Sequence, residues 1–122
     1  MQPLVELDQA TATVVRCAHA AVPPIDWQEV TVRTRIAPLG NVSNMQFTFR
    51  LTDGRISKGI EPVREAERLL DDATFAHWRT TEQLGLPRWY MMTVKLERSG
   101  KYSVDFEYRD TYQEGDIMKS LE

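Results

Sequence analysis

Residues 89–110, WYMMTVKLERSGKYSVDFEYRD, carry the pattern that decides the fold of this chain. Two stretches in which apolar and polar residues alternate lie on either side of the dipeptide Ser99-Gly100. Successive side chains of a β-strand point to opposite faces, so this alternation predicts a β-hairpin over residues 88–109. The apolar and polar faces of its second strand are formed by Tyr102, Val104, Phe106 and Tyr108 and by Ser103, Asp105, Glu107 and Arg109, respectively.

A second alternating region lies upstream of this hairpin, over residues 26–37 and 44–52. The intervening residues 38–41, PLGN, are typical of turns. Asp53-Gly54 then predicts a hairpin turn, after which residues 55–58 supply a short returning strand.

Two helical regions are predicted around these strands. Residues 4–22 place apolar side chains at the spacing of a one-sided helix, which Pro23-Pro24 ends. A second stripe runs from Glu61-Pro62 to Gly85, with Thr74 as a candidate break into two helices. Hairpin strands with segregated helices are typical of the α+β class. We predict a single domain over residues 1–122, with one antiparallel β-sheet of four to five strands and the helices packed on one face.

Aromatic and sulfur-containing side chains are expected in two roles. Those that recur at strand spacing are predicted to lie in the core: Phe47, Phe49, Tyr102, Phe106 and Tyr108. Others are less committed to the core and are candidate anchors at an interface: Tyr90, Met92 and Tyr112.

The composition is that of an ordinary globular domain of 122 residues, with 42% hydrophobic and 27% charged residues. No apolar run approaches the roughly 20 residues that a membrane-spanning helix needs. The first nine residues, MQPLVELDQ, carry acidic side chains where a signal peptide needs positive charge. We therefore expect a cytoplasmic protein that does not contact a membrane.

Negative charge is concentrated at the C-terminal end of the chain. The formal net charge of −3 divides into a balance of +1 over residues 1–104 and −4 over residues 105–122. Such a surface repels nucleic acid and favours a basic partner, but an ordinary solvated terminus has the same composition. Residues 110–122 are expected to form either a mobile acidic tail or a short helix.

No motif in the sequence predicts catalysis or metal binding. His19 and His77 fall outside any metal-binding spacing, and the single cysteine, Cys17, is expected to be a buried structural thiol. Asp105 and Glu107 form an i, i+2 carboxylate pair, but their alternation with apolar residues predicts that they face solvent. They would then lack the apolar pocket that raises the pKa of a catalytic carboxyl. We expect no enzymatic activity, no cofactor and no metal site.

A basic stripe across the first hairpin is an alternative binding surface. Arg33, Arg35 and Arg50 share the polar face there and are the kind of residues that contact RNA. Glu29 lies in the same row, and the near-neutral balance of the region argues against this reading.

Two groups of residues resemble a known family. Trp27 opens the first long strand after an initial helix, and the last hairpin combines Trp89 with Gly100-Lys101-Tyr102, Asp105 and Tyr108. In these positions the chain resembles the YezG-like family of bacterial immunity proteins against polymorphic or contact-dependent toxins. The resemblance implies a small cytoplasmic inhibitor. Such an inhibitor would bind the C-terminal domain of a secreted toxin, often a nuclease, and block its active site or substrate groove.

The resemblance and the charge asymmetry together suggest where a toxin would bind. An acidic surface can mimic nucleic acid and compete for the basic cleft of a nuclease. The expected toxin-binding residues are Asp105, Glu107, Asp110, Tyr112, Glu114 and Asp116. We expect no direct contact with nucleic acid, and a monomer or a weak dimer. Two alternatives remain: a secretion chaperone or adaptor that holds an effector, and a small-molecule-binding or enzymatic domain with a deep pocket.

Overall fold

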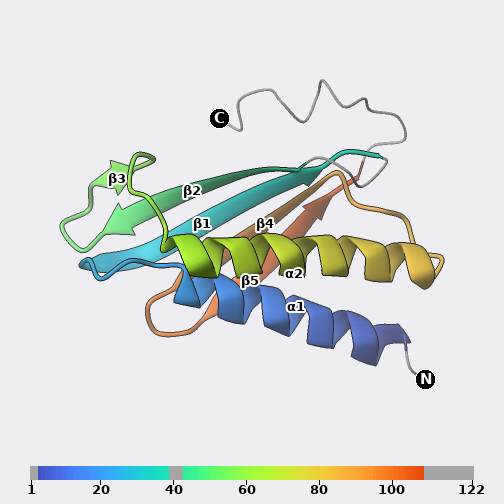
Figure 1. Cartoon of the computed structure of the whole chain (residues 1–122). Helices are drawn as coiled ribbons and strands as arrows, with labels where there is room; N and C mark the ends of the chain where they lie inside the picture. The colour runs from blue at the N-terminus through green and yellow to red at the C-terminus, as the bar shows by residue number, and fades with distance from the viewer. Residues whose placement is uncertain (1–2, 39–42, 109–122) are drawn as a thin grey trace.

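The chain folds into two layers, a β-sheet and a pair of helices (Figure 1). The computed structural model describes residues 3–38 and 43–108. In chain order the elements are α1 (Pro3–Ala20), β1 (Trp27–Ile36), β2 (Ser43–Leu51), β3 (Ile56–Ser57), α2 (Arg64–Gln83), β4 (Met91–Glu97) and β5 (Tyr102–Glu107). The strands pair antiparallel in the order β3-β2-β1-β4-β5. This confirms the prediction of an α+β fold with one antiparallel sheet, here of five strands.

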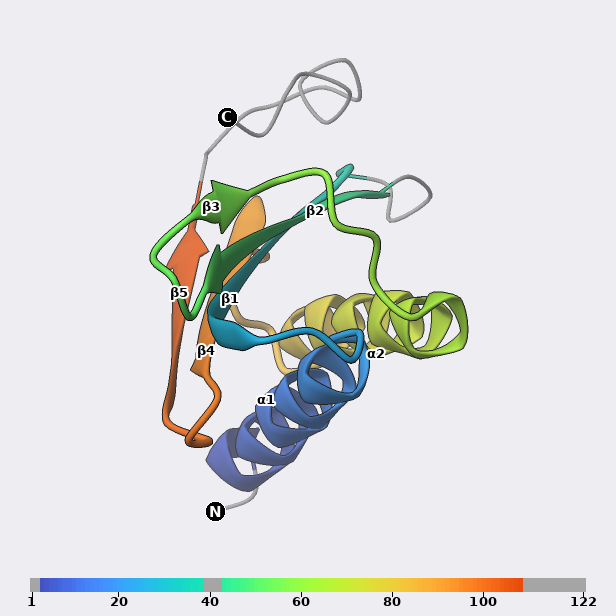
Figure 2. The ribbon, with the colours of Figure 1, turned by 90° about the vertical axis from the view of Figure 1, so that its left-hand side faces the viewer.

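Both helices lie on the same face of the sheet (Figure 2). The central strand β1 pairs with β2 on one side and β4 on the other, so rows of side chains cross the sheet. Three consecutive rows on the helix side are Phe49, Val30 and Leu96, then Phe47, Val32 and Val94, then Met45, Thr34 and Met92. All but Met45 are buried, so these rows form the core.

The helices add a second apolar layer to this core. Val14 of α1 and Leu70 of α2 are both at most 1% exposed. The backbone N–H of Val63 donates to the carbonyl of Ala21 at 2.8 Å, which ties the start of α2 to the end of α1. The expected break at Thr74 is wrong, because α2 runs through it without interruption. Its hydroxyl donates to the carbonyl of Asp71, 2.8 Å away in the preceding turn, and is satisfied inside the helix.

Glycine sets the geometry of both tight hairpin turns. The β4–β5 turn is closed by Glu97, whose N–H donates to the carbonyl of Lys101 at 2.8 Å, and Gly100 adopts a φ of +100° within it. The β2–β3 turn repeats this arrangement, with Gly54 at a φ of +90°. Each turn is therefore a three-residue loop with glycine in the third position, where a positive φ is required.

Two predictions about aromatic side chains are wrong. Tyr102 and Tyr108 are 50% and 56% exposed, because β5 is the outermost strand and the helices do not reach over its ends. Tyr90 and Met92 are each 1% exposed, so they belong to the core and not to an interface. Tyr112, the third candidate anchor, lies outside the described residues.

Candidate binding surface on the sheet and its end

The predicted acidic site begins on the face of β5 that points away from the helices. In the β4–β5 register Asp105 lies opposite Thr93, and Glu107 lies opposite Met91. Asp105 is exposed and Glu107 is half-buried. The other four predicted toxin-binding residues, Asp110, Tyr112, Glu114 and Asp116, lie outside the described part of the chain.

This face of the sheet carries both signs of charge. One row across the strands reads Gln46, Arg33, Thr93 and Asp105, and the next reads Asn44, Arg35, Met91 and Glu107. Neighbouring strands lie about 4.8 Å apart, so the backbones of β1 and β5 are about 10 Å apart across β4. On this face the carboxylates of the four longer strands are Asp105 and Glu107 of β5, Glu29 of β1 and Glu97 of β4.

The basic stripe considered from the sequence is interrupted. Arg50 lies opposite Glu29, and the row of Thr31 and Thr48 separates it from Arg33. An acidic residue thus lies beside one end of the stripe, and two threonines divide it on β1 and β2, although Lys95 of β4 lies opposite Thr31 in the same row. This arrangement is weaker as a phosphate-binding track than three aligned arginines would be.

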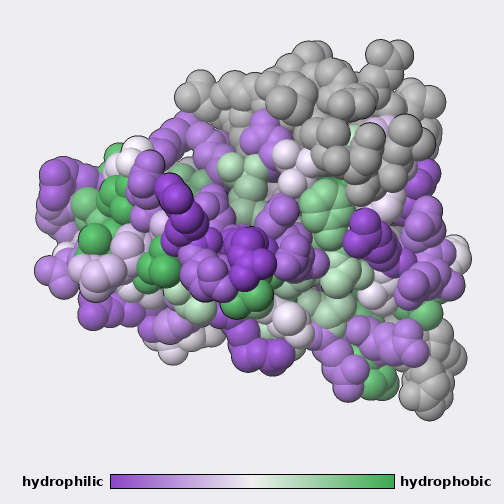
Figure 3. All heavy atoms as spheres, viewed as in Figure 1, coloured by the Kyte–Doolittle hydropathy of each residue, from purple (hydrophilic) through white to green (hydrophobic). Residues whose placement is uncertain are grey.

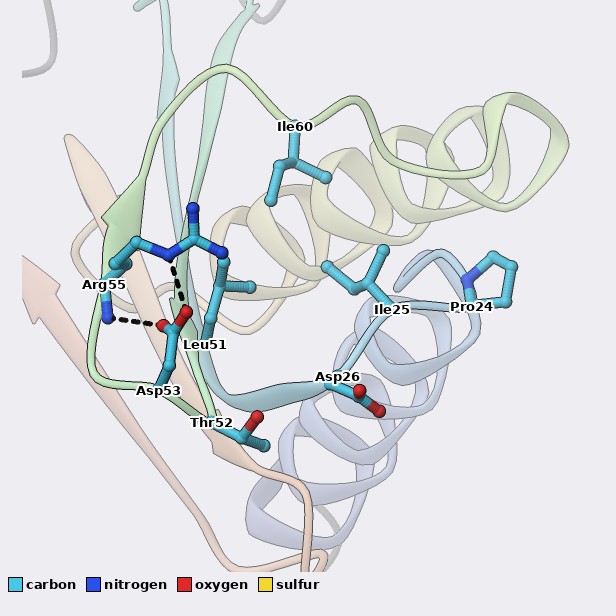
Figure 4. A pocket seen from close by; sticks show the side chains of 8 residues that line it. All are labelled: Pro24, Ile25, Asp26, Leu51, Thr52, Asp53, Arg55 and Ile60. Atoms are coloured by element: carbon cyan, nitrogen blue, oxygen red, sulfur yellow. Dashed lines mark hydrogen bonds and ion pairs between the residues drawn. The ribbon is translucent and has the colours of Figure 1, made fainter.

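A hollow of about 450 Å³ lies at the end of the sheet where β1 begins and β2 ends (Figure 4). Ile25, Leu51 and Ile60 come to it from three separate segments and supply its apolar surface. The volume is in the range of small-ligand sites, but the hollow is open to solvent. Apolar side chains also reach the surface at this end of the molecule (Figure 3), including Ile56 at 63% exposed.

Two of the three charged residues that line this hollow, Asp53 and Arg55, are engaged with each other, and the third is Asp26. Nε of Arg55 lies 2.6 Å from Oδ2 of Asp53, and the backbone N–H of Arg55 donates to Oδ1 at 3.0 Å. The Arg55 backbone N–H, followed by its side chain, lowers the pKa of Asp53. A carboxylate held ionised in this way is unsuited to proton transfer at neutral pH. The hollow is therefore better suited to receive an apolar side chain of a partner than to perform chemistry.

A second, smaller hollow of about 340 Å³ lies beside the first and shares Thr52 with it. The register of β1 shifts between Trp27 and Glu29, which marks a β-bulge at this end of the strand. The carbonyl of Gln28 accepts from the backbone N–H of Arg98 at 3.0 Å, so the bulge is joined to the β4–β5 turn. Neither hollow was predicted, because their lining residues come from segments distant in sequence.

His77 is buried in the described core, at 1% exposure. Its Nδ1 accepts a hydrogen bond from Nε1 of Trp89 at 3.1 Å, and its Nε2 lies 3.0 Å from Oγ1 of Thr11. The Thr11 hydroxyl donates to the carbonyl of Leu7 at 2.9 Å, so it accepts from Nε2. His77 is thus a neutral structural residue with both nitrogens engaged.

Neither histidine nor cysteine contributes to a metal site in the described structure. Within residues 3–38 and 43–108, no three His, Cys, Asp or Glu side chains come together in a group that could hold a metal ion. Cys17 is half-buried and packs against the core from α1, less enclosed than expected.

Neither α1 nor α2 combines the length and the apolar character needed to cross a lipid bilayer. Comparison with known proteins gives no family for the chain: no family model matches it, and no curated protein matches its sequence.

Proposed function

We propose that this chain is an immunity-type inhibitor, which binds a toxin domain with a basic cleft and neutralises it. The observation that carries the proposal is the position of Asp105 on the β5 border of the sheet face opposite the helices. Its carboxylate is exposed and makes no hydrogen bond or ion pair with any other described residue. It is therefore available to a cation of a partner.

The surroundings of Asp105 support a protein partner in preference to a small ligand. The face is formed by side chains of four strands and is not covered by either helix (Figure 2). Charged side chains on a face of this breadth give orientation and fast association with a complementary partner. Glu107 lies two residues along the same strand face and extends the acidic border.

The proposed mechanism is competition for the substrate groove. A toxin that binds nucleic acid presents lysine and arginine side chains to phosphates. Carboxylates on a rigid strand can bind those lysine and arginine side chains in place of phosphates. They contain no bond that the toxin could cleave. The sheet fixes the spacing of the carboxylates, so little conformational entropy is lost when they bind.

The first test is a tagged pull-down from the native cell, with bound proteins identified by mass spectrometry. The proposal expects a toxic protein domain whose activity this chain suppresses on co-expression. A bound partner that is harmless alone would instead favour a chaperone or adaptor. A chain that captures no partner would contradict the proposal.

The second test uses charge reversal on the purified complex. Asp105→Lys with Glu107→Lys is expected to weaken binding at least about tenfold and to reduce its salt dependence. The matched control is Glu61→Lys with Asp72→Lys, which reverses the same number of exposed charges outside the sheet. Equal effects of the two pairs would show that only net charge matters and would remove the β5 border from the proposal.

A further inference from the structure

The sheet has two edges. At one edge, β3 is two residues long and pairs only with Phe49 and Arg50, so the rest of β2 has no described strand on that side. At the other edge, β5 runs for six residues, from Tyr102 to Glu107, without proline and without a shift of register. No described element lies along its outer side (Figure 2). Proteins usually block such edges, because they are templates for strand addition.

The hairpin turn determines which backbone groups of β5 point outward. Glu97 and Lys101 form the hydrogen-bonded pair that closes the turn. Hydrogen-bonded and non-hydrogen-bonded pairs alternate along an antiparallel ladder. The backbone groups of Ser103, Asp105 and Glu107 therefore face β4. Those of Tyr102, Val104 and Phe106 face away from the sheet and are the ones a further strand would use.

We propose that β5 pairs antiparallel with β5 of a second copy of this chain, around a two-fold axis at Val104. The two sheets then become one continuous sheet across the dimer. This inference goes beyond the proposed function and does not depend on it.

Side chains on the face opposite the helices favour this register. With Val104 opposite itself, Lys101 lies opposite Glu107 of the second copy, and Ser103 lies opposite Asp105. Each contact occurs twice because a two-fold interface is self-complementary. The register shifted by two residues in one direction has similar overlap, but it places Asp105 opposite Asp105, and like charges directly opposite are destabilising.

Side chains on the helix side fit the same register. Tyr102, which is 50% exposed in the single chain, lies opposite the half-buried Phe106 of the second copy. Aromatic cross-strand pairs are among the more stabilising ones, and this pair also occurs twice. The pairing covers Tyr102 with an aromatic side chain that is itself continuous with the core, since Phe106 packs on His77.

Sedimentation velocity over the micromolar to low-millimolar range tests the dimer. Lys101→Glu is expected to weaken dimerisation about tenfold, because it places two carboxylates opposite each other at both ends of the interface. The double change K101E/E107K restores opposite charges in the proposed register and is expected to recover the dimer. The matched control is K101E/D105K, which recovers it only if the strands slip by two residues in the other direction.

Amide hydrogen exchange followed by NMR gives a measurement that does not depend on any variant. The amides of Tyr102, Val104 and Phe106 are expected to become protected as the protein concentration rises. Those of Ser103, Asp105 and Glu107 are expected to be protected at all concentrations by β4. A chain that stays monomeric overturns the proposal, as does a dimer insensitive to K101E. If the outward amides become protected only when a different protein is added, then that protein, and not a second copy of this chain, pairs with β5.

Discussion

Nε1 of Trp89 donates a hydrogen bond to Nδ1 of His77 at 3.1 Å, in the interior between α2 and the start of β4. This contact decides the protonation of the imidazole, because an acceptor at Nδ1 leaves the proton on Nε2. That proton is directed at the hydroxyl of Thr11 on α1. A series of hydrogen bonds between side chains therefore connects both helices to the segment that leads into β4.

The buried His77 predicts a loss of stability at acidic pH. Burial lowers its pKa from 6.5 to about 4, because the charged imidazolium is disfavoured away from water. The unfolded chain binds a proton at higher pH than the folded chain. The contribution of neutral His77 is therefore complete above pH 6.5 and is lost as the pH falls towards 4. The expected loss in unfolding free energy is about 3 kcal/mol.

Urea denaturation between pH 7 and pH 4 measures this loss. His77→Gln, which keeps an acceptor and a donor, is expected to flatten the pH dependence in that range. His19→Gln, at an exposed position, is the control and is expected to leave it unchanged. An unchanged slope in the His77 variant would assign the acid sensitivity to carboxylates.

Removal of the Thr11 hydroxyl is expected to destabilise the fold at neutral pH. Thr11→Val keeps the shape of the side chain but leaves the Nε2–H of His77 without an acceptor. An unsatisfied buried donor costs about 1–3 kcal/mol. Thr11→Ser retains the hydroxyl and is expected to lose much less. The comparison uses urea midpoints, and equal losses in the two variants would contradict a role for this hydrogen bond.

Any side chain at position 100 is expected to lower the stability of the fold. Its φ of +100° is strained for any L-residue, although a Cβ atom there would meet no other group. Gly100→Ala should lower the unfolding free energy by about 1–2 kcal/mol through backbone strain alone. Gly59→Ala is the control, since Gly59 has open space around it and no positive φ. Thermal unfolding distinguishes the two, and a stable G100A variant would contradict the turn geometry.

Phe106 and Tyr102 of β5 are expected to differ in their contribution to the stability of the single chain. The ring of Phe106 stacks on His77 with centroids 5.2 Å apart, so Phe106→Ala should cost about 2 kcal/mol. Tyr102 is half exposed, and Tyr102→Ala should change stability by less than about 0.5 kcal/mol. Unfolding at protein concentrations low enough to keep the chain monomeric checks this. A large loss for Y102A under those conditions would indicate packing that the described structure lacks.

Most of the secondary structure could be predicted from the sequence because local rules decide it. The alternation over β5 and the position of Gly100 in the turn are properties of short segments. The faces of Asp105 and Glu107 followed from the same alternation, and the structure places both on the side away from the helices. These features depend on neighbours two to four residues away, which the sequence displays directly.

Only part of the candidate site could be predicted by the same reasoning. Burial of a strand depends on its place in the sheet, and the alternation of β5 is the same at an edge as at the centre. Tyr102 was therefore expected in the core, although the outermost position of β5 leaves it half exposed. No sequence pattern predicted the hollow lined by Ile25, Leu51 and Ile60, because these residues belong to three segments that meet only after folding.

The sequence by itself determined where the helices and strands lie along the chain, which of their faces are apolar, and the excess of negative charge at the C-terminal end. Only the tertiary structure decided that Trp89 and Thr11 meet at His77, which charged residues of different strands share a sheet face, and that β5 is the outermost strand. The physical reason is the range of the interactions. Periodicity and turn chemistry act within a few residues, whereas strand order, burial and hydrogen bonds between helices depend on how distant segments share one core.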